Sequence, residues 1–197
     1  MVVALGAGCA PLEYRIDETK GIPSVAGALD VNLGTGLQCG TPIMAGDVMV
    51  TTQVVPGGCG LSFGKQLELL SAQDYADIPD FRPPSVLVQR VELTVKKLAF
   101  TDGAGQPVDL ATRILAAKLS VNGQTLADKD ALTRLPLVVP LEGEALAPLK
   151  AGVDARQPVS VGAQGEVAIP NEPPPPDKLH IEYDVQPALI IGTGKIL

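Results

Sequence analysis

The chain of 197 residues contains no tryptophan, only three tyrosines and three phenylalanines, and one histidine, His180. Aromatic rings are the platforms on which nucleic-acid bases and sugars stack, so their scarcity argues against recognition by stacking. Acidic residues outnumber basic ones by 22 to 15, which gives a net charge of −7. Because such a chain has no general attraction for phosphate backbones or anionic head groups, we expect no nucleic-acid partner.

Signals of catalysis and of cofactor binding are also scarce. No glycine-rich phosphate loop of the GxxxxGK[ST] or GxGxxG type occurs in the sequence. His180 alternates with Glu182 and Asp184 along an amphipathic stretch, which is typical of the solvated face of a strand. We therefore expect a protein without cofactor that is not an enzyme; the alternative is an enzyme whose site is assembled across loops.

The small, apolar N-terminal stretch stops at Cys9, in LGAGC. This segment resembles the lipobox of bacterial lipoproteins, in which small residues precede the cysteine that is diacylated and becomes the mature N-terminus. Leu5 lies four places before the cysteine instead of three, and only eight residues precede Cys9. The resemblance therefore implies a truncated signal peptide. The alternative is that residues 1–9 form a short first strand with a buried thiol.

For a lipoprotein, Cys9 would carry the lipid, and the following Ala10 would direct the protein to the outer membrane. The resemblance thus implies export, with membrane contact through the N-terminal lipid only. Residues 10–24 are rich in charge, proline and glycine, which is typical of a solvated tether. We accordingly assign residues 1–23 to signal remnant, lipobox and tether, and residues 24–197 to a single domain.

Export predicts a disulfide between the other two cysteines, Cys39 and Cys59. They enclose a loop of about 20 residues, and paired cysteines are oxidised outside the cytosol. The competing interpretation is a copper(I) site, since Met44 and Met49 lie inside that loop. A blue-copper site needs two histidines, and the chain has only His180; we therefore expect no metal here.

Glycine (21 residues) and proline (18 residues) are abundant, which favours short strands and turns over long helices. The sequence predicts an all-β protein, an antiparallel β-sandwich of immunoglobulin-like or jelly-roll-like type with one or two short helices. The clearest helix candidate is Lys65–Tyr75. Asn122-Gly123 predicts a hairpin turn, the change of phase at Lys96-Lys97 a bulge, and Pro140 an edge strand.

Weak calcium candidates are Asp74, Asp77 and Asp80, which recur at every third position without matching an EF-hand loop. The leading functional prediction is a non-catalytic structural or protein-binding subunit of the bacterial cell envelope, facing the periplasm or the cell surface, with an envelope protein as partner. The first alternative is a lipoprotein that binds a small ligand or calcium.

Overall fold

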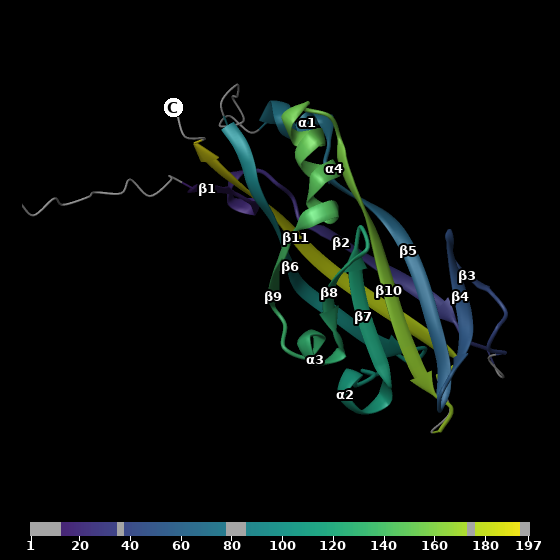
Figure 1. Ribbon diagram of the computed structural model, residues 1–197. Coiled ribbons are helices and arrows are strands. Elements are labelled where there is room, and N and C mark those ends of the chain that lie inside the picture. Colours follow the sequence, from purple (N-terminus) through teal and green to yellow (C-terminus); the bar gives the residue numbers. More distant parts are fainter. Residues whose placement is uncertain (1–12, 35–37, 78–85, 173–175, 194–197) are drawn as a thin grey trace, which may run out of the picture.

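The computed structural model describes residues 13–34, 38–77, 86–172 and 176–193. In these residues two antiparallel sheets pack face to face, with short helices near both ends (Figure 1). The all-β antiparallel sandwich is therefore confirmed. The strands are β1 (Glu13–Ile16), β2 (Val25–Asn32), β3 (Ile43–Ala45), β4 (Val48–Val55), β5 (Gly58–Leu70), β6 (Val86–Asp102), β7 (Ala116–Val121), β8 (Gln124–Asp128), β9 (Leu137–Leu141), β10 (Val159–Pro170) and β11 (Lys178–Thr193). The helices are η1 (Glu18–Lys20), α1 (Ala72–Asp77), α2 (Leu110–Arg113), α3 (Lys129–Leu132) and α4 (Gly143–Asp154).

Sheet A is built around β11, which pairs along one side with β6, and β6 pairs with β9. On its other side β11 pairs with β2 over residues 178–185 and with β1 over residues 189–192. Sheet B has the order β3-β4-β5-β10-β7-β8. β10 pairs with the whole of β5, whereas β4 pairs with β5 only over residues 58–63. Beyond Phe63, β5 is thus an edge strand within the described sheet.

Three local predictions are confirmed. Asn122 and Gly123 form the two-residue turn between β7 and β8, both with positive φ (47° and 82°), as a type I′ hairpin requires. Along β6, Lys97 pairs with Asp184 and Val95 with Val185. Lys96 is the extra, bulged residue. β9, which contains Pro140, pairs only with β6 in the described sheet and forms an edge.

The predicted helix at Lys65–Tyr75 is wrong over residues 65–70, which complete β5. Lys, Gln, Leu and Glu favour a helix over a strand by only tenths of a kcal/mol each, about 0.5 kcal/mol or less. Pairing with β10 outweighs this preference, and Leu67 and Leu69, two residues apart, both become buried. The helix α1 begins only at Ala72.

The predicted tether is wrong from Glu13 onward. β1 pairs with β11, and the side chains of Ile16 and Ile22 are fully buried. Lys96 extends from its bulge to the Glu18 carboxylate at 2.6 Å, which ties η1 to sheet A. The segment therefore belongs to the sandwich because Ile16 and Ile22 complete the core.

The helix α4 was not predicted. It buries Ala145, Leu149 and Val153, which recur every fourth residue, and it packs against β6 and β10. That spacing is the helical signal, but Pro148 inside the helix obscures it. No helix in the described ranges is long and apolar enough to cross a membrane.

The interior contains two clusters of buried residues. The upper core, at the α4 end of Figure 1, is centred on Leu93, Leu141 and Leu149. The lower core, at the other end, is centred on Leu61 and Ile181. Each cluster draws residues from both sheets, so the sheets are held together at two levels.

The predicted cysteine pair is present. Cys39 and Cys59 form a disulfide with a Cα–Cα distance of 5.7 Å. It joins the segment before β3 to the start of β5, beside the lower core. The same segment is held by Thr52, whose hydroxyl accepts from the Gly40 amide and donates to the Thr41 carbonyl, both at 2.8 Å.

Candidate functional site

Between the upper and the lower core the two sheets enclose an apolar cavity of about 260 Å³. At this level sheet B presents Ala117, Ala163 and Gly165 to the interior. Their side chains are too short to reach the opposite sheet. The cavity thus follows from small residues that two neighbouring strands of sheet B, β7 and β10, place side by side.

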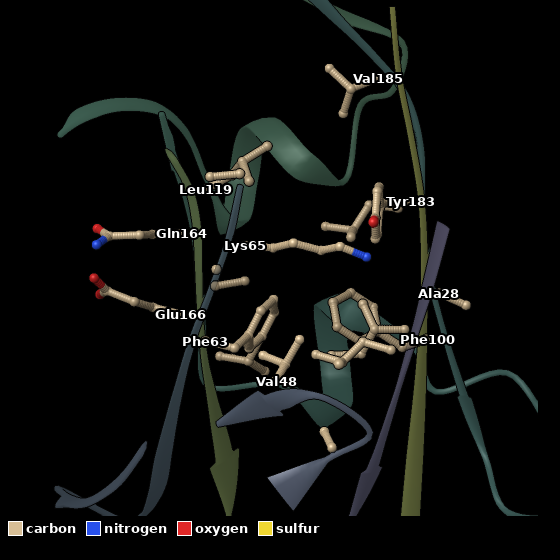
Figure 2. A pocket seen from close by; sticks show the side chains of 18 of the residues that line it. Ala28, Val48, Phe63, Lys65, Phe100, Leu119, Gln164, Glu166, Tyr183 and Val185 are labelled. Carbon is tan, nitrogen blue, oxygen red and sulfur yellow. The ribbon is translucent and has the colours of Figure 1, made fainter. Parts of the chain in front are cut away.

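Two aromatic rings lie on glycines at the cavity wall (Figure 2). The ring of Phe63 covers Gly165 so closely that a Cβ there would collide with it. On the facing sheet, the Tyr183 ring covers Gly27 in the same way. Each ring therefore lies flat along its own sheet instead of filling the space between the sheets.

Lys65 is an unusual residue on this wall. It lies on β5 between Phe63 and Leu67, two residues from each, and residues at this spacing share one face of a strand. Figure 2 shows the Lys65 side chain extending across the cavity toward Tyr183. The Lys65 ammonium has no hydrogen bond or ion pair with any residue that the structure describes.

The cavity reaches solvent beside Lys65, near two strand edges that are unpaired in the described sheets. β4 ends its pairing with β5 at Phe63, and the facing strand β2 pairs only with β11 among the described strands. The turn between β3 and β4, Gly46-Asp47, also lines the cavity. Lys65 is exposed although it faces the interior. Its side chain is therefore open to solvent at the mouth as it crosses the cavity.

Two polar residues of β10 point away from the cavity. Gln164 and Glu166 on β10 direct their side chains away from it (Figure 2). Glu166 instead pairs with Lys118 across the outer surface of sheet B, at 3.6 Å. The site is therefore an apolar chamber with one cation and one phenol, a composition suited to binding a small molecule.

His180 lies on the outer surface of sheet A, as its alternation with Glu182 predicts. Its Nδ1 is 2.8 Å from the Asp30 carboxylate and its Nε2 is 3.6 Å from that of Glu182. The hydrogen bond to Asp30 raises the pKa of His180 above its usual value. The same bond lowers the pKa of Asp30. This charge cluster faces away from the cavity interior, so the histidine does not serve it.

Of the three calcium candidates, the structure describes the side chain of Asp74 alone. Asp74 accepts a hydrogen bond from the Ser71 amide at 2.5 Å, and its own amide donates to the Ser71 hydroxyl at 3.3 Å. This reciprocal pair caps the start of α1. Asp80 and the side chain of Asp77 lie outside the described residues, as does Cys9. Within those residues no three His, Cys, Asp or Glu side chains are grouped to hold a metal ion.

One further pattern resembles a catalytic motif in its letters. GLSFG, at residues 60–64, has the G-x-S-x-G spacing of a nucleophile elbow. An elbow requires a sharp turn from a strand into a helix. Ser62 lies instead in mid-strand, paired with Thr51 of β4 and Glu166 of β10. The structure therefore gives this serine no exposed, strained position.

Sequence reasoning did not find the cavity. Lys65 is the one available signal, because it interrupts the alternation of apolar residues at 61, 63 and 67. That alternation is visible only when the segment is taken as a strand.

Comparisons with protein-family models, with curated proteins and with solved structures find no match to this chain. The fold and the site define the class of protein on their own: an antiparallel β-sandwich with an apolar chamber between its sheets.

Proposed function

We propose that this protein is a non-catalytic carrier or receptor that holds a small apolar molecule between its two sheets. The observation that carries the proposal is the apolar chamber of about 260 Å³ between the two sheets. Apolar cavities take up apolar ligands. Figure 2 shows the side chains of Lys65 and Tyr183 in the chamber, and neither group is a good general acid or base near pH 7.

The test uses 1-octanol as a neutral apolar probe and Ala163→Leu as the variant. Ala163 lies directly opposite Lys65 in the pairing of β10 with β5. A leucine at 163 would fill part of the chamber. We expect octanol to raise the melting temperature of the unaltered protein, since a ligand that binds only the folded state stabilises it. The variant should lose most of that rise.

Ala116→Leu is the matched control, because Ala116 is an exposed residue of β7 outside the chamber lining. It should keep the full response to octanol. If octanol has no effect on the unaltered protein, or if Ala163→Leu responds as strongly as the control, the proposal is wrong.

We also propose that the protein is exported and anchored by a lipid on Cys9. The resemblance of LGAGC to a lipobox supports this. The Cys39–Cys59 disulfide is compatible with it, because disulfides persist in oxidising compartments. Metabolic labelling of the native-length precursor with a fatty acid should mark the protein. Label that survives Cys9→Ser would contradict the assignment.

A protein-binding role at the envelope is the second candidate. Met44 and Met49 lie directly opposite each other on β3 and β4, and each is 60% exposed. Adjacent flexible apolar side chains on a surface favour adaptable contacts with a partner. Cross-linking in the native envelope tests this role: a partner captured by the unaltered protein should be lost with the Met44→Lys, Met49→Lys double variant. A cross-linking pattern that the double variant leaves unchanged would count against this surface.

A further inference from the structure

We infer that the ligand of the chamber is a single-chain amphiphile with an anionic head, of the medium-chain carboxylate class, and that Lys65 binds the head at the mouth. This inference rests on the proposed function, because it names the chemistry of the molecule that the chamber holds.

Lys65 lies in a row of apolar residues on the inward face of β5. Its neighbours on the inward face of β5, Phe63 and Leu67, both pack into the core clusters. Lys65 thus has apolar neighbours on both sides along its face of the strand. Its ammonium is without an ion pair in the part of the chain that the structure describes. An anionic group from outside the chain would supply the missing partner.

The chamber separates an apolar interior wall from one charged group. The interior wall consists of Ala117, Ala163, Val167 and similar residues, whereas the ammonium of Lys65 belongs to a side chain that reaches solvent. A ligand that fits this arrangement has an apolar tail and one charged end. Charge-assisted hydrogen bonds from an ammonium to a carboxylate are about twice as strong as neutral ones.

The volume of the chamber limits the length of the ligand that it can hold. A cavity of about 150 Å³ binds benzene, which has six non-hydrogen atoms, so by proportion a chamber of about 260 Å³ holds about ten. An eight-carbon chain is of this length class. A sixteen-carbon chain would leave about half of its atoms outside.

Two acidic residues near the chamber, Asp30 and Asp47, influence how strongly an anion would bind there. The Asp30 carboxylate is paired with His180 at 2.8 Å and with Lys178 at 3.2 Å. Asp47, in the turn that lines the chamber, is exposed and is not ion-paired with Lys65. Its carboxylate would repel an incoming anion. Asp47→Asn should therefore strengthen binding of an anion about two- to threefold, the scale of a charge pair near the surface.

The experiment measures the affinities of octanoate and 1-octanol, which share a chain and differ in the head, by titration calorimetry. We expect the unaltered protein to bind octanoate about tenfold more tightly than octanol, the scale of one hydrogen-bonded charge. Lys65→Met should abolish that preference by weakening octanoate binding about tenfold, and leave octanol binding within about twofold. Lys65→Arg should keep the preference, since it keeps the charge.

Lys118→Met is the matched control, because it removes an ammonium from the outer surface of the same sheet. It should change neither affinity. Added salt should weaken octanoate binding and leave octanol binding unchanged, a measurement that needs no variant.

The outcomes separate this inference from the function on which it rests. Equal affinities for octanoate and octanol, unchanged by Lys65→Met and by salt, overturn the assignment of the head group and leave the chamber as a neutral site. Absence of binding for both probes overturns the chamber itself.

Discussion

The two ends of the sandwich are tightly packed, and the level between them is not. In the upper core Leu93 and Leu149 are each 1% exposed, and in the lower core Leu61 and Ile181 are equally buried. Between them sheet B contributes alanine and glycine, and both aromatic rings lie flat on glycines. The difference shows that the chamber is a consequence of side-chain size at one level, in a frame whose strands continue unbroken past it.

The packed ends should carry the stability of the fold. Leu149→Ala in the upper core and Leu61→Ala in the lower core should each lower the free energy of unfolding by about 2–5 kcal/mol. Leu119→Ala, at the chamber wall, should cost less than about 2 kcal/mol, because part of that side chain faces empty space and has fewer contacts to lose. Urea denaturation measures all three. Equal losses would mean that the chamber closes in solution.

The disulfide should stabilise the lower end. By the chain-entropy model a loop of 20 residues contributes about 3 kcal/mol. A Cys39→Ser, Cys59→Ser double variant should therefore unfold at lower urea than the oxidised protein. Reducing agent should destabilise the unaltered protein and have no effect on the double variant. Detection of both thiols free in the folded, oxidised protein by mass spectrometry would contradict the pairing.

Glycine at 165 should be needed for the flat position of Phe63. Gly165→Ala places a Cβ against the ring, and we expect a loss of about 1–3 kcal/mol, the scale for overpacking. The chamber offers the displaced ring a place to move, so the same variant should bind octanol less tightly. Gly64→Ala is the control, because a Cβ there meets the nearest atom, the Ala163 carbonyl oxygen, at an ordinary 3.7 Å. If Gly165→Ala and Gly64→Ala change stability and octanol binding equally, the contact between Gly165 and Phe63 does not determine the position of the ring.

The smallest effect concerns the outer surface of sheet A. The pKa of His180 should lie above its ordinary value, mainly because of the hydrogen bond to Asp30. The stabilisation from this pair is fully present below the unfolded pKa of the histidine and is lost as pH rises through the raised folded pKa. NMR titration of the His180 ring measures the shift, and Asp30→Asn should lower the pKa. Octanol binding should not follow this titration, because the cluster lies outside the chamber.

Local patterns in the sequence predict strands, a turn and a bulge of the fold. Alternation marked the strands, Asn122-Gly123 defined a turn, and the two lysines at 96 and 97 marked a bulge. The same reasoning failed for residues 65–70, where weak helix preferences of single side chains competed with a ladder to a strand about 100 residues away. Such a ladder depends on tertiary pairing, which local propensity does not report.

The chamber could not be predicted from the sequence for a similar reason. Gly27, Phe63, Gly165 and Tyr183 come from four strands that meet only after both sheets have formed. Glycine and alanine in a strand indicate weak strand formation, and only the register shows that several of them share one level. Lys65 was visible as an interruption of an apolar row, but its segment had first to be recognised as a strand.

The central claim, that the space between the two cores is a ligand chamber, is tested most directly by intermolecular NOEs between 1-octanol and the methyl groups of the protein. We expect contacts from octanol to the methyls of Ala117, Ala163 and Leu119. We expect none to those of Leu149 in the upper core or Val31 in the lower core. Contacts confined to surface methyls such as those of Met44 and Val54, or none at saturating octanol, would contradict it.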